Sequence, residues 1–457
     1  MPIFTAIFLL TGLISGPGLT SAGTASTSPQ PLADHQRSYA QAQDEVAIDT
    51  SYLQVLAGAQ DYAGNIYALL VTPDSILKIY RSSDRGGSWE PTLTMPLPAP
   101  VSQAELLIAR PDTAKIFIFL LTTNAGGDLW LVRTAPDFTS RDWLPVAVGP
   151  DTIDRFTVAV DNNSRPYLYC LYVREHRTGP NGRFTRSLDL GSTWESPQDF
   201  YNCSQPCLYF AAGTLHCAWC YAIDNRQLHY TRNRHFGAPA RWEPLQVLYA
   251  AGEQCFTPAV VQAETTPPWR APVWIAWTVA RRDTEMLDLL ITCSTDGGST
   301  FSVPVNLGEP FIDEWWPSLT ATSTTLNLLY NAGARGENDP TVIYHRYARS
   351  YAPQLLSSPL KINDSRANPA VFGARPRALG SGALFSHYGA GTTARGLYFC
   401  RLVPPLVSRP RTTKPALTTS LVLDPAGRRV NLTGSSRKPG VYFLSEGDRW
   451  RKLLILR

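Results

Sequence analysis

The sequence predicts an all-β fold assembled from repeated units, and three observations lead to this prediction. A short Ser-x-Asp-x-Gly motif occurs three times, at intervals of about 105 and about 107 residues. Short runs rich in β-branched and aromatic residues recur along the chain, whereas helical periodicity is hard to find. Hydrophobic residues make up 44% of the chain and charged residues only 17%, a composition typical of a turn-rich, folded β protein.

The repeated motif fits the pattern S-x-D-x-G-x-[ST]-[WF] and predicts a tight turn between two strands. Its serine hydroxyl and aspartate carboxylate can accept backbone N–H bonds inside the turn, and its glycine supplies a positive φ. Its terminal aromatic residue is expected to fold back onto apolar neighbours. The motif positions are Ser82, Asp84, Gly86 and Trp89 in the first copy, Ser187, Asp189, Gly191 and Trp194 in the second, and Ser294, Asp296, Gly298 and Phe301 in the third.

This motif resembles the Asp box of sialidase-like (BNR-repeat) β-propellers. The resemblance implies a ring of four-stranded blades, with the twelve motif residues in a structural role on the outer rim. Each interval then holds two blades of roughly 53 residues. The strand count gives seven blades, whereas the resemblance favours six. The expected second strands are Ile66–Val71, Ile116–Thr122, Tyr167–Val173, Leu215–Tyr221, Val273–Val279, Leu326–Asn331 and Ala383–His387.

Two further expectations concern the strands that begin and end the blades. The last unit has no obvious fourth strand, and a segment near Glu45–Thr50 is expected to supply it and close the ring, which would protect both sheet edges. Four prolines are expected to be the first residues of inner strands, because no ladder donor is lost there. These are Pro206, Pro258, Pro317 and Pro369.

The N-terminal part of the chain predicts export. Ile3–Ile14 is an apolar stretch too short to span a bilayer, although no Lys or Arg precedes it. We assign residues 1–25 to a signal peptide, 26–44 to a linker and 45–405 to the propeller. No transmembrane segment is expected, and the net charge of +4 without a basic stripe indicates no nucleic-acid partner.

The C-terminal part carries a second set of motifs after a Pro-rich linker at 406–420. They are a D-x-x-G-R-x-V run at Asp424–Val430, a P-G-V-Y-F run at Pro439–Phe443 and a basic, apolar end at Arg457. Residues 421–457 therefore resemble the C-terminal sorting domain of the type IX secretion system. The resemblance implies the secretion machinery as a partner and a secreted or cell-surface location, reached by way of the periplasm of a Gram-negative bacterium. The alternative is a small accessory β-domain without a sorting role.

The cysteines leave two interpretations open. Cys217 and Cys220 lie three residues apart in an expected strand and so point to opposite faces, and no His pair accompanies them. We therefore expect no metal site and no cofactor. If Gly213-Thr214 forms a two-residue hairpin turn, Cys207 lies opposite Cys220 and a cross-strand disulfide can form. The alternative is a set of buried free thiols.

The candidate site residues lie in loops that lead into inner strands. The resemblance implies that sialidase catalysis needs three arginines, an acid/base Asp and a Tyr–Glu pair, but the stretch from Ala47 to Tyr80 contains no arginine. We expect no sialidase catalysis and place ligand binding at Arg155, Asp313, Glu314, Trp315 and Arg366. Asp313, Glu314 and Tyr388 are weak catalytic candidates, and Glu314 has the alternative of a solvated loop carboxylate.

Together these features predict a propeller that binds a glycan or another surface polymer without sialidase catalysis. Adjacent carboxylates beside tryptophan can engage a sugar by hydrogen bonds and ring stacking. Two alternatives stay open, because propellers host unrelated functions. One is a diverged exo-sialidase or other glycoside hydrolase, and the other is a surface scaffold or adhesion protein.

Overall fold

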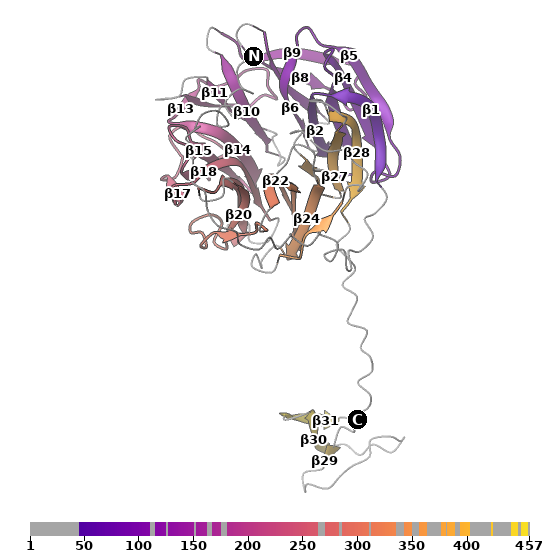
Figure 1. Cartoon of the computed structure of the whole chain (residues 1–457), viewed down its shortest axis with the longest axis vertical. Helices are drawn as coiled ribbons and strands as arrows, with labels where there is room; N and C mark the ends of the chain where they lie inside the picture. Colours follow the sequence, from indigo (N-terminus) through magenta and orange to yellow (C-terminus); the bar gives the residue numbers. More distant parts are fainter. Residues whose placement is uncertain are drawn as a thin grey trace, which may run out of the picture. The chain divides into compact units, whose positions relative to one another are not determined.

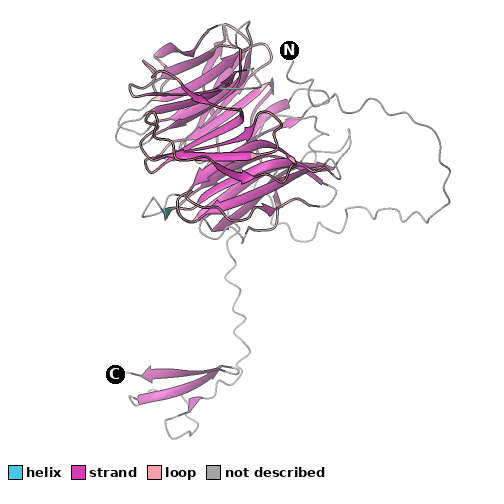
Figure 2. Ribbon diagram, turned by 90° about the vertical axis from the view of Figure 1, so that its left-hand side faces the viewer, coloured by secondary structure: helices cyan, strands magenta, loops and turns pink. Residues whose placement is uncertain are grey.

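The computed structural model contains seven four-stranded antiparallel sheets arranged as the blades of a β-propeller (Figure 1). Seven blades are therefore confirmed over six. Figure 2 shows the molecule turned by 90° and coloured by secondary structure, and the blades consist of strands joined by loops. The structure describes residues 45–109, 115–124, 127–149, 152–161, 167–174, 181–263, 270–282, 286–309, 312–334, 342–349, 356–362, 376–380, 382–388, 394–402, 422–423, 440–446 and 449–455.

Each blade runs from an inner strand at the centre of the ring to an outer strand at the rim. The inner strands are β2 (Val55–Gln60), β6 (Val101–Ile108), β10 (Ile153–Val160), β14 (Cys203–Ala211), β18 (Gln254–Gln262), β22 (Ile312–Ala321) and β26 (Arg377–Ala378). The second strands are β3 (Ile66–Val71), β7 (Ile116–Thr122), β11 (Leu168–Arg174), β15 (Thr214–Tyr221), β19 (Val273–Ala280), β23 (Thr325–Ala334) and β27 (Gly382–Tyr388).

The third strands are β4 (Ile76–Ser82), β8 (Leu129–Thr134), β12 (Gly182–Ser187), β16 (Leu228–Asn233), β20 (Leu287–Ser294), β24 (Val342–Arg349) and β28 (Ala394–Arg401). The outer strands are β5 (Glu90–Pro96), β9 (Arg141–Ala147), β13 (Gln198–Phe200), β17 (Gln246–Tyr249), β21 (Val305–Asn306), β25 (Leu360–Lys361) and β1 (Val46–Leu53). β1 pairs with β28, so the first strand of the propeller completes its last blade.

The core consists of seven apolar clusters, one in each seam between neighbouring blades. The second strands are mostly apolar because both of their faces are covered; every residue of β3 and β7 is buried. Apolar area removed from water in these seams holds the blades together.

The strand-opening prolines lie elsewhere than expected. Pro206, Pro258 and Pro317 are inside β14, β18 and β22, at β-bulges where the ladder pairing shifts. The residue before each proline has a positive φ: 50° at Gln205, 45° at Thr257 and 57° at Trp316. A bulge leaves a residue outside the ladder, so it tolerates a residue without an N–H. Pro369 lies outside the described residues.

Of the two interpretations of the cysteines, the Cys207–Cys220 disulfide is not found, because the hairpin register differs by two residues from the one it requires. The turn between β14 and β15 is Ala212-Gly213, with φ of 51° and 81°, so Cys207 pairs with Ala218. Positive φ at both central residues is the geometry of a type I′ hairpin turn. All eight cysteines are free thiols in the structure.

The three Ser-x-Asp-x-Gly turns join the third and outer strands of their blades at the rim. In each turn the serine hydroxyl accepts the glycine N–H at 2.7 Å. The aspartate carboxylate accepts hydrogen bonds from the residue four positions later. Burial alone would raise the pKa of Asp296, but hydrogen bonds from Ser294, Thr300 and Ser299 lower it to about 2. The carboxylate is therefore ionised and committed to the turn.

Each of these turns packs against the third strand of the preceding blade. The motif aromatics Trp89, Trp194 and Phe301 contact Phe399, Phe119 and Tyr230 of that blade at ring-centroid distances of 5.4, 6.2 and 4.9 Å. The motif glycines Gly86, Gly191 and Gly298 have positive φ, and a Cβ there would collide with Phe399, Leu131 and Tyr230. Only glycine fits both the φ and the space.

An arginine lies two residues after Phe399, Leu131 and Tyr230 and binds the turn that each of them contacts. Arg186 binds the corresponding turn of the fourth blade, and we call Arg133, Arg186, Arg232 and Arg401 the rim arginines. Arg401 donates to the Asp84 and Arg85 carbonyls, each at 2.9 Å. Arg133 donates to the Leu190 carbonyl at 3.1 Å.

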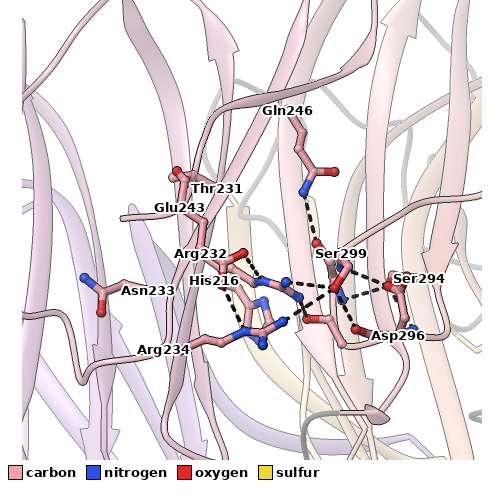
Figure 3. Close-up of polar contacts among 12 residues, drawn as sticks. His216, Thr231, Arg232, Asn233, Arg234, Glu243, Gln246, Ser294, Asp296 and Ser299 are labelled. Carbon is pink, nitrogen blue, oxygen red and sulfur yellow. Dashed lines mark hydrogen bonds and ion pairs between the residues drawn. The ribbon is translucent and has the colours of Figure 1, made fainter. Parts of the chain in front are cut away.

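The same arrangement occurs in the next two seams. Arg186 binds the Phe236 carbonyl at 2.7 Å, although that turn lacks the motif. Arg232 binds the Gly297 carbonyl, Ser299 and Glu243 (Figure 3). Four of the seven seams thus share a turn held by the preceding blade.

The C-terminal strands β29 (Val422–Leu423), β30 (Gly440–Glu446) and β31 (Arg449–Ile455) form an antiparallel sheet of their own. Asp424–Val430, the linker at 406–420 and the apolar stretch Ile3–Ile14 lie outside the described residues. No helix in the described part of the chain is long and apolar enough to span a bilayer.

Candidate functional site

The inner strands enclose a central cavity of about 260 Å³. It lies where these strands begin, so six of the seven blades contribute to its wall. The lining residues are Gln54, Val55, Leu56, Ser102, Gln103, Ala104, Glu105, Arg155, Phe156, Gln205, Pro206, Thr257, Pro258 and Arg377. A concave site with a few polar groups among apolar ones is the usual form of a ligand pocket.

Side-chain hydrogen bonds between blades fix the wall of this cavity. The Gln103 amide donates to the Phe156 carbonyl at 2.7 Å and accepts the Phe156 N–H at 3.1 Å. Gln205 accepts the Thr257 N–H at 2.6 Å. Each glutamine thereby links its own blade to the next one. The polar groups of the wall are held in place before any ligand arrives, which lowers the ordering cost of binding.

Two arginines and one glutamate supply the charge of the lining. Arg155 Nε lies 2.9 Å from Asp154 Oδ2, its neighbour in β10. Arg377 Nη2 lies 2.7 Å from Glu105 Oε1. Arg377 Nε is buried and has no hydrogen-bond partner. The cavity therefore presents guanidinium donors that a polar or acidic ligand can use.

The structure separates the predicted ligand-binding residues. Arg155 lines the cavity, whereas Asp313, Glu314 and Trp315 lie on β22 and are not part of the lining. Asp313 Oδ1 accepts the Leu287 N–H at 2.8 Å and so secures the start of β20. Arg366 lies outside the described residues.

Tyr388, the other catalytic candidate, ends β27, where its backbone pairs with Ala394. The structure does not describe the position of its side chain. In the described part of the chain, no group of three or more His, Cys, Asp or Glu residues is placed to hold a metal ion.

Glu314 is a buried acid between the fifth and sixth blades. Glu314 is only 2% exposed, so the alternative of a solvated loop carboxylate is wrong. Oε1 accepts the Glu309 N–H at 2.9 Å, and Oε2 is buried without a partner. Burial raises the pKa of Glu314 to about 8, against the opposing effect of the Glu309 N–H. The carboxyl is therefore largely protonated at neutral pH, but its burial keeps it away from a substrate.

Sequence reasoning missed the other polar residues of the cavity, which are Gln54, Ser102, Gln103, Glu105, Gln205, Thr257 and Arg377. One signal was available: Gln205 and Thr257 precede prolines at equivalent positions of successive blades. The bulges at Pro206 and Pro258 bring these residues to the cavity wall. Gln103, Glu105 and Arg377 belong to no repeated motif.

Comparison with known proteins places this fold among solved propellers. No protein-family model and no curated protein matches the chain. A polysaccharide lyase described as an ulvan lyase, solved with bound -[GlcA(1-4)Rha3S]-, is similar with a TM-score of 0.52 at 10% identity, over 78% of this chain and 96% of that one.

Two other similar structures have lower scores. The Aleuria aurantia lectin with bound Fucalpha1-6GlcNAc has a TM-score of 0.44 at 10% identity, over 69% and 99% of the two chains. The Penicillium chrysogenum α-L-arabinanase has a TM-score of 0.41 at 11% identity, over 78% and 98%. At these identities the likeness concerns the fold alone.

Proposed function

We propose that this protein is a secreted or cell-surface β-propeller that binds a glycan, or another surface polymer, in its central cavity without sialidase catalysis. One observation carries the proposal: inter-blade hydrogen bonds hold the polar groups around a 260 Å³ cavity that six blades build. Amide and guanidinium donors fixed in this way suit the hydroxyl and acidic groups of a sugar. A polysaccharide-bound structure with this fold supports the choice of ligand class.

The charged groups of the cavity favour binding over sialidase chemistry. That chemistry needs several arginines around the sugar carboxylate and a tyrosine nucleophile. The described lining has two arginines, each already paired with a carboxylate, and it includes no Tyr, His or Lys. Glu314, the acid with the raised pKa, is buried outside this wall.

Replacing Arg155 by alanine is expected to weaken glycan binding about tenfold, because a charge-assisted hydrogen bond to the ligand is lost. The measurement is a glycan array followed by titration calorimetry with the best ligand. Arg226→Ala is the matched control: Arg226 is exposed in the β15–β16 loop and lies outside the lining. Equal losses in both variants would contradict a site in the cavity. Turnover of a fluorogenic sialoside by the parent protein would overturn the non-catalytic part.

The proposed location depends on the two ends of the chain. We propose that 1–25 directs export and that 421–457 directs passage through the outer membrane. Deleting 439–457 in a host with type IX secretion is expected to retain the protein in the periplasm. Unchanged amounts in the medium would contradict this role and favour the accessory-domain alternative.

A further inference from the structure

The ion pair between Arg377 and Glu105 connects two blades that are not neighbours. Arg377 belongs to β26 of the seventh blade and Glu105 to β6 of the second, so the first blade lies between them in the ring. Both side chains line the cavity, with exposed fractions of 23% and 20%. The pair is therefore partly accessible to a molecule that enters the cavity.

The pair leaves part of the guanidinium unused. Arg377 donates through Nη2 at 2.7 Å, while its Nε is buried without an acceptor. A guanidinium presents its N–H groups as a rigid fork that matches a carboxylate or sulfate with two parallel hydrogen bonds. Because Nε is buried, an acidic ligand group must compete with the Glu105 carboxylate for the accessible part of the guanidinium, whose side chain is 23% exposed.

The second arginine of the lining adds to the attraction of the cavity for an acidic ligand group. Arg155 lines the same cavity, and its carboxylate partner Asp154 is not part of the lining. Glu105 is thus the one carboxylate among the described lining residues, opposed to two guanidinium groups.

We propose that Glu105 is a built-in competitor for Arg377, so that the cavity selects glycans that carry an acidic group and Glu105 sets their affinity. This inference rests on the proposed glycan binding and names the ligand class of that site. The shared chemistry is a carboxylate or sulfate on a sugar ring. Neutral glycans carry no charge to replace the Glu105 carboxylate at Arg377 and would bind more weakly.

The test compares full-length parent protein with Glu105→Gln, which keeps the size and an oxygen acceptor but removes the charge. The probes are oligogalacturonate against its methyl ester, and dextran sulfate against dextran, so that the two pairs distinguish carboxylate from sulfate. We expect Glu105→Gln to bind the preferred acidic probe at least about fivefold more tightly, since a unit charge a few ångströms away is removed. The affinity of Glu105→Gln for the matching neutral probe, the methyl ester or dextran, should equal that of the parent protein.

Two further variants complete the experiment. Asp224→Asn makes the same charge change in the β15–β16 loop, outside the lining, and should leave affinity unchanged within about twofold. Arg377→Gln should lower the preference for the acidic over the neutral probe at least about fivefold, because Arg155 is then the remaining guanidinium of the described lining. This variant keeps the inference testable if Glu105→Gln does not fold, which a thermal melt would show.

The outcomes separate this inference from the proposed function. Parent protein that binds glycans but shows no acidic preference, or no tighter binding after Glu105→Gln, overturns the role of Glu105 alone. Equal tightening in Asp224→Asn shows a general charge effect and overturns it as well. If folded parent protein and variants bind no glycan at all, the proposed function fails and this inference fails with it.

Discussion

Replacing Arg232 by alanine is expected to lower the free energy of unfolding by about 3 kcal/mol, because a buried charge network is broken. Arg232 is only 3% exposed. Its guanidinium bonds Glu243 at 2.7 Å and Ser299 at 2.8 Å, and it also binds the Gly297 carbonyl (Figure 3). Alanine removes this donor from the seam between the fourth and fifth blades. Glu243 keeps its ion pair with Arg234 at 2.9 Å, whereas the Gly297 carbonyl loses a buried partner. Urea unfolding followed by tryptophan fluorescence measures the loss.

Arg133→Ala is the matched control for this variant. Arg133 is the rim arginine between the second and third blades, but its partner Asp142 has a side chain that is 56% exposed. Water can replace the lost bonds there, so we expect a loss of about 1 kcal/mol or less. A loss in the Arg232 variant no larger than in the Arg133 variant would show that the buried network does not stabilise the seam.

Replacing Glu314 by glutamine is expected to remove a decrease in stability that the parent protein shows between about pH 6.5 and pH 8. The pKa of Glu314 rises from its ordinary value of 4.5 to about 8 on folding, chiefly through burial. The folded state thus holds the proton more tightly than the unfolded state does. Its contribution is complete below about pH 4.5 and is lost as the pH rises toward 8, by up to about 1.4 kcal/mol per pH unit.

Buried histidines act in the opposite direction at lower pH. Burial lowers the pKa of His216 to about 3 and that of His345 to about 4. Each favours the unfolded state below its ordinary pKa near 6.5, so these histidines add a slope of opposite sign in acid. Above about pH 6.5 they no longer contribute, and Glu314 should dominate.

The difference in unfolding free energy between Glu314→Gln and the parent isolates this residue. We expect that difference to grow by about 2 kcal/mol in favour of the variant from about pH 6.5 to pH 8. Asp224→Asn, which removes an exposed carboxylate in the β15–β16 loop of the fourth blade, is the control and should give a nearly constant difference. A constant difference for Glu314→Gln as well would mean that the carboxyl titrates normally in the folded protein.

The blades were predictable from the sequence because burial on two faces leaves a continuous apolar run. Ile66–Val71 and Ile116–Thr122 have the same bounds in the structure as in the prediction. The predicted starts of the inner strands are wrong, because Pro206 and Pro258 are not first residues. They lie at bulges inside strands that begin three and four residues earlier. Bulges depend on pairing with the next strand, which local sequence does not encode.

The cavity was predictable only at Arg155. Its wall takes one short contribution from each of six blades, so residues such as Glu105 and Arg377 meet across 272 positions of sequence. The sequence around Glu105 gives no sign that Arg377 will be its partner, and the sequence around Arg377 gives no sign of Glu105. Glu314 illustrates a related limit: its position ahead of Pro317, the expected first residue of the strand, predicted a loop, but pairing with Ala332 places it inside β22, where its side chain is buried.

The pairing of β1 with β28 has a consequence for how the chain reaches its folded state. Val46 pairs with Phe399, so the last sheet requires residues from both extremes of the propeller. Contacts of such high sequence separation form late, because the entropy of closing a long loop must be overcome first. During synthesis or translocation β1 is available first and lacks its partner until β28 follows, and the six other blades can assemble in the meantime. A chain shortened so that it loses either β1 or β28 would leave the edge of the remaining last-blade strand unpaired and be prone to aggregate.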